Sequence, residues 1–108
     1  MRRGEIWAAT GPGYAGKPRP VVILQDDRFD ETESVTVCGF TTDPAEARWS
    51  RPTVEPSGIN GLRERSRVMV DKITTISRTG AAYRIGSLDD DDLARLNSAV
   101  IIFLGLAG

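Results

Sequence analysis

An arginine flanked by prolines opens an apolar run of this chain, in the stretch GKPRPVVILQ at residues 16–25. The guanidinium of an arginine is always protonated and presents a planar fork that matches two phosphate oxygens. The prolines restrict the backbone on both sides of Arg19. A second apolar run ends in Thr41 and Thr42, whose hydroxyls can orient a phosphate or a sugar hydroxyl. Taken alone, these residues are most simply a solvated arginine and two turn threonines, but strand ends commonly carry functional sites.

The composition excludes several familiar catalytic chemistries. The 108 residues contain no histidine and a single cysteine, Cys38. Ser-His-Asp chemistry, a histidine-activated thiolate and an internal disulfide are therefore ruled out. A zinc site has almost no ligands available, and we expect neither a metal ion nor another cofactor. Cys38 lies in a β-branched run and is expected to be a small core residue.

Two further motifs have simpler explanations than a site. The segment GPGYAGK at residues 11–17 matches the first part of a P-loop, but Pro18 replaces the hydroxyl residue and a strand is expected next. Nucleotide hydrolysis is therefore not expected. The acidic run at residues 89–92 is best explained as compensation of a helix dipole, because consecutive helical carboxylates point apart and do not converge on a metal.

Apolar runs bounded by turn residues predict five to seven short strands. We expect strands over residues 5–10, 19–25, 34–40, around 53–55, 66–76 and 81–88. The run at 66–76 is the longest candidate and is expected to bend near its end. The run at 19–25 is continuously apolar, which indicates burial on both faces, and Trp7 within the first strand is expected in the core.

From Ser87 onward the period of the apolar residues changes to three and four, which predicts a helix. Its apolar face carries Leu93, Leu96, Val100, Phe103 and Leu104. Ser87 and Asp90 resemble a capping box at its start. This apolar face is larger than a helix needs if it only covers the sheet of its own chain. Part of the surrounding surface is therefore expected to be buried in a homodimer. The whole pattern indicates a mainly β chain, a small antiparallel barrel or open sheet with a covering C-terminal helix.

The length of the chain predicts one domain over residues 1–108. No secretory signal pattern is visible, and the longest apolar run, residues 99–104, is far too short to span a bilayer. We therefore expect a soluble, cytoplasmic protein with no membrane association. The net charge of −1 does not by itself indicate a nucleic-acid partner.

Four segments taken together resemble the MazF/PemK family of toxin endoribonucleases from type II toxin–antitoxin systems. They are MRRGEIWAA, GKPRPVVILQ, VTVCGFTT and SRVMVDKITTI, and with the terminal helix they extend over nearly the whole chain. The resemblance implies an SH3-like small antiparallel barrel of the CcdB/PemK type, assembled as a homodimer. It also implies sequence-specific, metal-independent cleavage of single-stranded RNA, and inhibition by a cognate MazE-like antitoxin.

The resemblance also implies a set of site residues. The catalytic arginine of the family falls on Arg19, its catalytic threonine falls best on Thr41, with Thr42 as the alternative, and an associated serine matches Ser66. RNA binding by stacking and by charge is expected from the loops. The candidates for it are Tyr14, Lys17, Thr42, Arg48, Trp49 and Arg51. Trp49 is equally well explained as a core or dimer anchor.

Two questions stay open at this stage. No carboxylate can be assigned as the proton acceptor, and no histidine exists to serve. Two other functions fit the same fold: a non-catalytic gyrase inhibitor of the CcdB type, and a silent SH3-like binding module. The ending IFLGLAG lacks the Trp-Gly-Ile ending of the CcdB type, which argues against the gyrase inhibitor.

Overall fold

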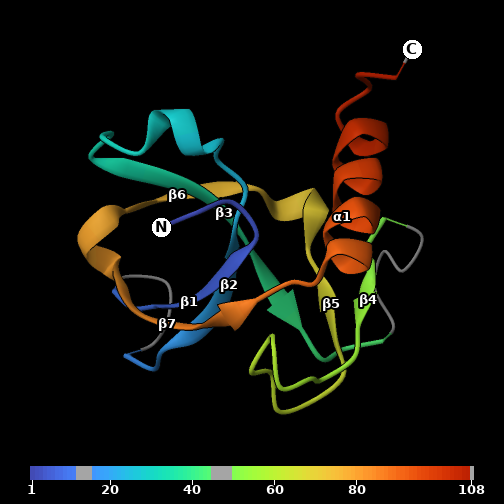
Figure 1. Cartoon of the computed structure of the whole chain (residues 1–108), viewed down its shortest axis with the longest axis horizontal. Helices are drawn as coiled ribbons and strands as arrows, with labels where there is room; N and C mark the ends of the chain where they lie inside the picture. Colours follow the sequence, from blue (N-terminus) through green and yellow to red (C-terminus); the bar gives the residue numbers. More distant parts are fainter. Residues whose placement is uncertain (12–15, 45–49, 108) are drawn as a thin grey trace.

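The computed structural model describes residues 1–11, 16–44 and 50–107. Antiparallel strands curve into a half-barrel, and one helix stands against its side (Figure 1). The strands of this described part are β1 (Glu5–Ala9), β2 (Arg19–Ile23), β3 (Ser34–Thr41), β4 (Thr53–Val54), β5 (Ser66–Val68), β6 (Thr74–Ser77) and β7 (Ala81–Ser87). The helical elements are the short 3-10 turns η1 (Asp27–Phe29), η2 (Val70–Lys72) and η3 (Arg78–Gly80), and the α-helix α1 (Asp90–Phe103). The predicted mainly β fold with a C-terminal helix is confirmed.

Strand β3 lies at the centre of the sheet, whose order is β4-β5-β3-β2-β1-β7. One edge of β3 pairs with β2, and its other edge is shared between β6, along residues 34–37, and β5, along residues 40–41. All of these pairings are antiparallel. The ends of β2, β3 and β5 therefore meet at one side of the half-barrel.

The prediction of one long strand over residues 66–76 is wrong. Phe40 pairs with Val68 and Val37 with Thr74, so three steps along β3 are matched by six steps along the other chain segment. The extra residues form the turn η2, which turns the Val70 side chain into the core, where it is fully buried. The gain from burying Val70 explains why the chain leaves the ladder here instead of continuing as one strand.

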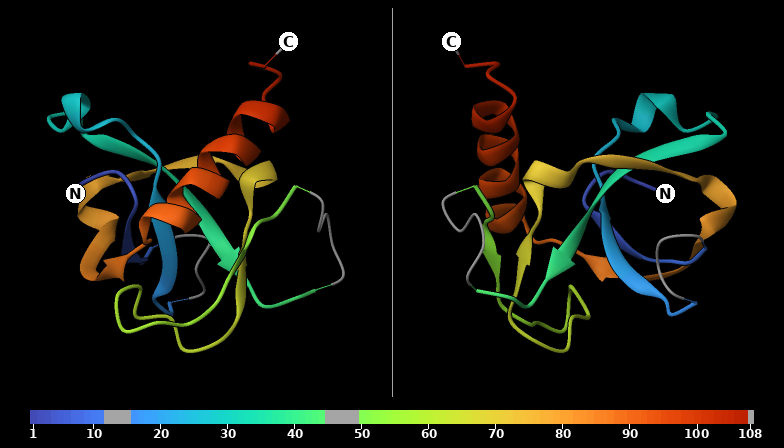
Figure 2. Two further views of the ribbon diagram at one scale, coloured as in Figure 1. Left: turned by 45° about the vertical axis from the view of Figure 1, so that its right-hand side comes forward. Right: turned by 180° about the vertical axis from the view of Figure 1, so that it is seen from behind.

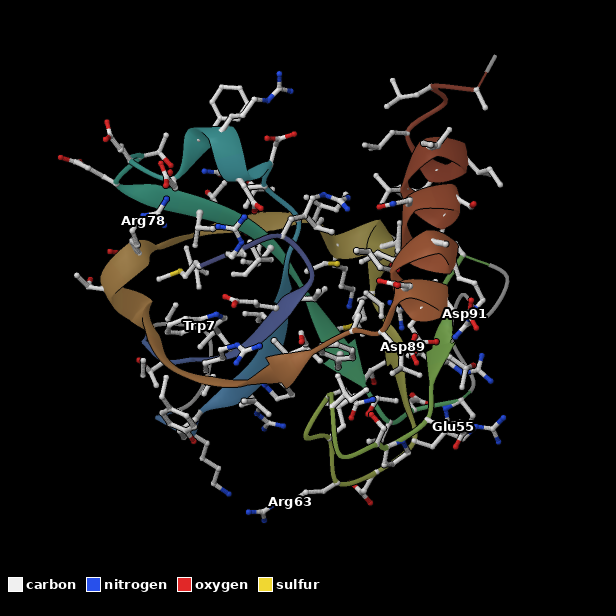
Figure 3. All side chains as sticks on the ribbon, viewed as in Figure 1. Trp7, Glu55, Arg63, Arg78, Asp89 and Asp91 are labelled. Atoms are coloured by element: carbon white, nitrogen blue, oxygen red, sulfur yellow. The ribbon has the colours of Figure 1, made fainter. Side chains whose placement is uncertain are left out.

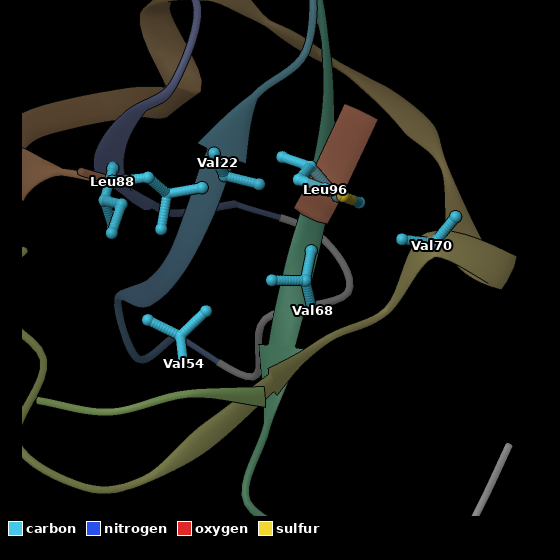
Figure 4. Close-up of a cluster of buried hydrophobic side chains, with 8 residues drawn as sticks. Val22, Val54, Val68, Val70, Leu88 and Leu96 are labelled. Carbon is cyan, nitrogen blue, oxygen red and sulfur yellow. The ribbon is translucent and has the colours of Figure 1, made fainter. Parts of the chain in front are cut away.

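Two apolar clusters lie on opposite faces of the sheet. Between the sheet and α1 lie Ile6, Val22, Cys38, Val54, Val68, Val70, Leu88 and Leu96 (Figure 4). The other face holds Ala9, Val21, Ile23, Val35 and Val37, with Trp7 packed against them. The continuous apolar run of β2 divides between both clusters, which confirms the predicted burial on both faces. Trp7 itself is half-buried, and its Nε1 donates to Glu5 Oε1 at 3.0 Å.

The start of α1 differs from the sequence prediction. Asp89, not Ser87, is the N-cap: its Oδ1 accepts from the backbone N–H of Asp92 at 2.8 Å. Ser87 is the last residue of β7, and only Leu88 and Asp89 separate that strand from the helix. The three aspartates of the first turn lie where carboxylates offset the positive end of the helix dipole, as predicted.

The far end of α1 extends beyond the sheet (Figure 2). Leu96 is buried, whereas Ile102 and Leu106 are 68% and 70% exposed. Ile101, Phe103 and Leu104 are exposed as well. The described chain therefore carries several exposed apolar side chains at its C-terminal end that its own sheet does not cover.

Candidate active site

An open cavity of about 700 Å³ lies where the ends of β2, β3 and β5 meet. It brings together Arg19, Thr41 and Ser66, the residues predicted to be catalytic, and also the alternative threonine, Thr42. The full lining is Pro18, Arg19, Pro20, Phe40, Thr41, Thr42, Gly61, Leu62, Arg63, Glu64, Ser66, Tyr83 and Ile85. Residues separated by up to 67 positions in the chain, from Pro18 to Ile85, thus share one site.

The pairing of the strands explains why these residues meet. In the ladder of β2 and β3, Val21 lies opposite Gly39, and the same register continued by two residues places Arg19 opposite Thr41. On the other side of β3, Thr41 pairs with Arg67, the neighbour of Ser66. Side chains at opposite positions of an antiparallel pair lie about 5 Å apart at their Cβ atoms. The predicted site is therefore a consequence of strand register, in which three adjacent strands end together.

Arg19 is exposed at the rim of this cavity and makes no side-chain hydrogen bond or ion pair with any described residue. The other arginines of the described chain are mostly committed to internal partners, as in the pairs of Arg28 with Asp26 and of Arg84 with Glu5. A guanidinium with five free N–H donors in a cavity is suited to bind an anion from outside the chain.

The two threonines differ in how firmly they are held. Thr41 is half-buried at the end of β3, and its Oγ1 accepts from the backbone N–H of Asp43 at 3.1 Å. Its O–H is thereby left to donate toward the cavity. Thr42 is exposed, lies beyond the strand, and has no side-chain hydrogen bond to the described residues. The geometry favours Thr41 as the oriented hydroxyl.

Ser66 is nearly buried, and its Oγ donates to the main-chain oxygen of Glu64 at 2.9 Å. The hydroxyl thus ties the start of β5 to the segment that forms one wall of the cavity. The proton of the hydroxyl is therefore engaged, whereas its lone pairs can still accept a hydrogen bond. Ser66 lies where the prediction requires it, with a structural contact that the sequence did not indicate.

Arg63, Glu64 and Tyr83 also line the cavity, and sequence reasoning missed all three. The loop that carries Arg63 and Glu64 is folded around the side chain of Asn60, which is 2% exposed. Asn60 Oδ1 accepts from the backbone N–H groups of Ser57 and Leu62 at 3.0 and 2.9 Å, and Nδ2 donates to the Glu55 carbonyl at 2.8 Å. Arg63 projects outward at the end of the molecule opposite the C-terminus (Figure 3).

This loop lies against β7 at two glycines. Gly61 has a φ of +69°, and a Cβ there would lie 2.6 Å from the Ile85 carbonyl oxygen. A Cβ on Gly86 would lie 2.5 Å from the Asn60 carbonyl oxygen. The only sequence signal for this arrangement is the turn-rich composition of residues 56–66, which does not say which side chains face the cavity.

Arg51, one of the residues predicted to contact RNA, is buried in the fold. Its side chain is 2% exposed, and its Nε and NH2 groups donate to the two carboxylate oxygens of Asp71 at 2.7 and 2.9 Å. The hydrogen bonds from Arg51 hold the pKa of Asp71 below its ordinary value. Arg51 does not line the cavity. Its charge is used inside the fold, which does not favour an RNA contact at Arg51, and that assignment stays a prediction.

Of the remaining residues predicted to bind RNA, the structure describes one and leaves three outside its described ranges. Lys17 is exposed two residues before Arg19 but is not part of the cavity lining. Tyr14, Arg48 and Trp49 lie outside the described residues. Their assignments therefore stay predictions.

Cys38 is buried in the cluster beneath α1, and burial raises the pKa of its thiol to about 12. It is a core residue, as predicted, and not a nucleophile.

Within residues 1–11, 16–44 and 50–107, no group of three or more Cys, Asp or Glu side chains is placed to hold a metal ion. Among the same residues, no helix is long and apolar enough to cross a membrane.

Comparison with known proteins gives a match over nearly the whole chain. The model of the family described as PemK-like, MazF-like toxin of type II toxin-antitoxin system matches residues 2–104. A relative described as "Probable endoribonuclease MazF" from Mycolicibacterium smegmatis is 49% identical over 109 residues, and the match covers 100% of both chains.

Solved structures give the same result for the fold. The toxin MazF-mt6 of Mycobacterium tuberculosis superposes with a TM-score of 0.78 at 26% identity, covering 94% of this chain and 96% of that one. A mycobacterial endoribonuclease in complex with its cognate antitoxin gives a TM-score of 0.81 at 22% identity, with 98% and 96% covered. The MazE–MazF complex of Deinococcus radiodurans gives 0.78 at 18% identity, with 97% and 95% covered.

Proposed function

The chain belongs to the PemK-like, MazF-like toxin family of type II toxin–antitoxin systems, and we propose that it cleaves single-stranded RNA at specific sequences without a metal ion. One observation carries this proposal: the unpartnered guanidinium of Arg19 shares an open cavity with the held hydroxyl of Thr41 and with Ser66. In the transition state of phosphodiester cleavage, negative charge develops on the phosphate oxygens. A cation and a hydroxyl donor placed beside the phosphate stabilise that charge.

In this reaction the ribose 2′-hydroxyl attacks the adjacent phosphorus and the 5′-oxygen of the next nucleotide leaves. The products are a 2′,3′-cyclic phosphate and a 5′-hydroxyl. Negative charge grows on the non-bridging oxygens as the phosphorane forms, and the fork of Arg19 can donate to two of them at once. Thr41 donates its O–H to the phosphate and fixes its orientation, a role suited to a hydroxyl that is a weak acid and a weak base.

The partners follow from the family and from the surface of α1. We assign residues 1–108 to a single toxin domain that forms a homodimer, acts in the cytoplasm and is inhibited by a MazE-like antitoxin. The exposed apolar side chains at the end of α1, Ile102 and Leu106 foremost, give a surface for a protein partner. The gyrase-inhibitor alternative has no such support, since the relatives that match are MazF toxins.

The test begins with cleavage of a mixed-sequence RNA in EDTA and sequencing of the new 5′ ends, which maps the preferred site. On an oligonucleotide with that site, Arg19→Ala is expected to lower the cleavage rate by roughly 10²- to 10³-fold, the loss typical of one transition-state donor. Arg19→Lys keeps the charge but loses the fork and is expected to rescue only part of the rate.

Arg28→Ala is the matched control, because Arg28 is exposed on η1 and contacts its near neighbours Asp26 and Phe29, which do not line the cavity. It is expected to leave the rate unchanged. Full cleavage by Arg19→Ala in EDTA, or cleavage that requires an added divalent ion, contradicts the proposal.

A further inference from the structure

Glu64 supplies the one carboxylate among the described residues that line the Arg19 cavity. The other charged side chains of the lining are Arg19 and Arg63, and the other group there that can exchange a proton is the phenol of Tyr83. Carboxylic acids ordinarily lose their proton near pH 4 and phenols near pH 10, about six units apart. At neutral pH, a carboxylate is therefore the class of group in this cavity that is ready to accept a proton.

The carboxylate of Glu64 is also uncommitted. It makes no hydrogen bond or ion pair with any residue in the described ranges. The adjacent guanidinium of Arg65 does not neutralise it, because Arg65 Nε pairs with Glu55 Oε1 at 2.7 Å. A glutamate left unpaired between two arginines in sequence is free to act on a substrate.

The backbone of Glu64 is nevertheless fixed. Its carbonyl oxygen accepts the hydrogen bond from the nearly buried Ser66, and the preceding loop is held by the three hydrogen bonds of Asn60. The Cα of Glu64 is therefore held in place next to the start of β5, which carries Ser66, while the side chain can still rotate about it. An anchored residue with a free carboxylate is the arrangement that general base catalysis needs.

We propose that Glu64 is the general base of the cleavage reaction; this inference rests on the proposed function. The Glu64 carboxylate takes the proton of the ribose 2′-hydroxyl as the 2′-oxygen forms its bond to phosphorus. The bond between phosphorus and the 5′-oxygen breaks, and the leaving oxygen keeps the electron pair and takes a proton from solvent water. Glu64 then returns its proton to solvent. Arg19 holds the charge of the phosphorane between these events.

The test uses the full chain and the oligonucleotide whose site has been mapped with the wild type. Glu64→Gln keeps the shape and removes the base, and it is expected to lower kcat by about 10²-fold or more, with KM changed less than about threefold. Glu64→Asp keeps a carboxylate one methylene further back and is expected to recover part of the rate.

A substrate with sulfur in place of the leaving 5′-oxygen separates the base from an acid, since a thiolate leaves without a proton. If Glu64 is the base, Glu64→Gln stays defective on this substrate by the same factor. Recovery of the Glu64→Gln rate on the sulfur substrate overturns the assignment, because it makes Glu64 the acid instead. Glu31→Gln, an exposed glutamate outside the cavity, is the control and is expected to keep the wild-type rate.

The outcomes for the two proposals are distinct. If the wild type does not cleave RNA at all, the proposed function fails. If the wild type cleaves and Glu64→Gln cleaves equally fast, only the role of Glu64 fails. Circular dichroism and a thermal melt of each variant establish that it is folded before its rate is compared.

Discussion

The side chain of Asn60 is expected to stabilise this protein more than any exposed polar residue of its loop. Asn60 is 2% exposed and makes three hydrogen bonds to backbone groups of its own loop. Asn60→Ala removes all three and leaves two N–H groups and one carbonyl without their partner. At about 1 kcal/mol for each net hydrogen bond, the free energy of unfolding is expected to fall by about 3 kcal/mol.

The assay is urea denaturation at a fixed protein concentration, because a dimer would make the midpoint depend on concentration. Asn97→Ala is the matched control. Asn97 is half-buried and its side chain accepts one hydrogen bond, from Arg3 at 2.6 Å, so its loss is expected to cost about 1 kcal/mol. The loop held by Asn60 carries Leu62 and Glu64 into the cavity, so RNA cleavage is expected to fall with stability only in the Asn60 variant. A smaller loss of stability for Asn60→Ala than for Asn97→Ala would refute the reasoning.

Two further results are expected. The hydrogen bonds from Arg51 lower the pKa of Asp71 in the folded chain, so this pair stabilises the fold at pH values above the ordinary pKa of about 3.9 and the contribution is lost as the pH falls below it. Between about pH 4 and pH 2, the wild type should therefore lose unfolding free energy more steeply than Asp71→Asn, and equal slopes in acid denaturation would contradict this. Gly86→Ala is expected to cost more than about 2 kcal/mol, because the new Cβ would meet the Asn60 carbonyl oxygen at 2.5 Å, whereas Gly58→Ala, with no atom within 4 Å, should leave the melting temperature within a few degrees of wild type.

Most of the strands, and the meeting of Arg19 with Thr41, were predictable because they follow from local patterns. The apolar runs of β2 and β3 define those strands, and Arg19 and Thr41 stand at their ends, so antiparallel pairing alone brings the two residues together. The break between β5 and β6 was not predictable in the same way. It depends on a pocket for Val70 that exists only once α1 is packed on the sheet. A run of β-branched residues carries no sign of that pocket.

The wall formed by Arg63 and Glu64 was missed for a related reason. Their positions are set by Asn60, which binds groups on both sides of itself in the chain, and by the contact of Gly61 with Ile85 on β7. A turn-rich segment shows that the chain bends but gives neither the direction of the bend nor the strand that it meets. The proton acceptor was therefore absent from the sequence-based site, although the residue proposed for the role lies only two positions before Ser66.

The chain contains the dipeptide Arg-Pro twice: Arg19-Pro20 opens β2, and Arg51-Pro52 directly precedes β4. The structure gives the two arginines opposite roles. Arg51 is buried, and the fork of its Nε and Nη2 groups is filled by the carboxylate of Asp71, so this fork is not available to a phosphate. Arg19 is exposed and lines a cavity, and its fork is unoccupied by any described residue. The carboxylate that distinguishes the two arginines is Asp71, which is 20 residues from Arg51 in sequence. The different situations of Arg19 and Arg51 are therefore set by the fold and not by the dipeptide that they share.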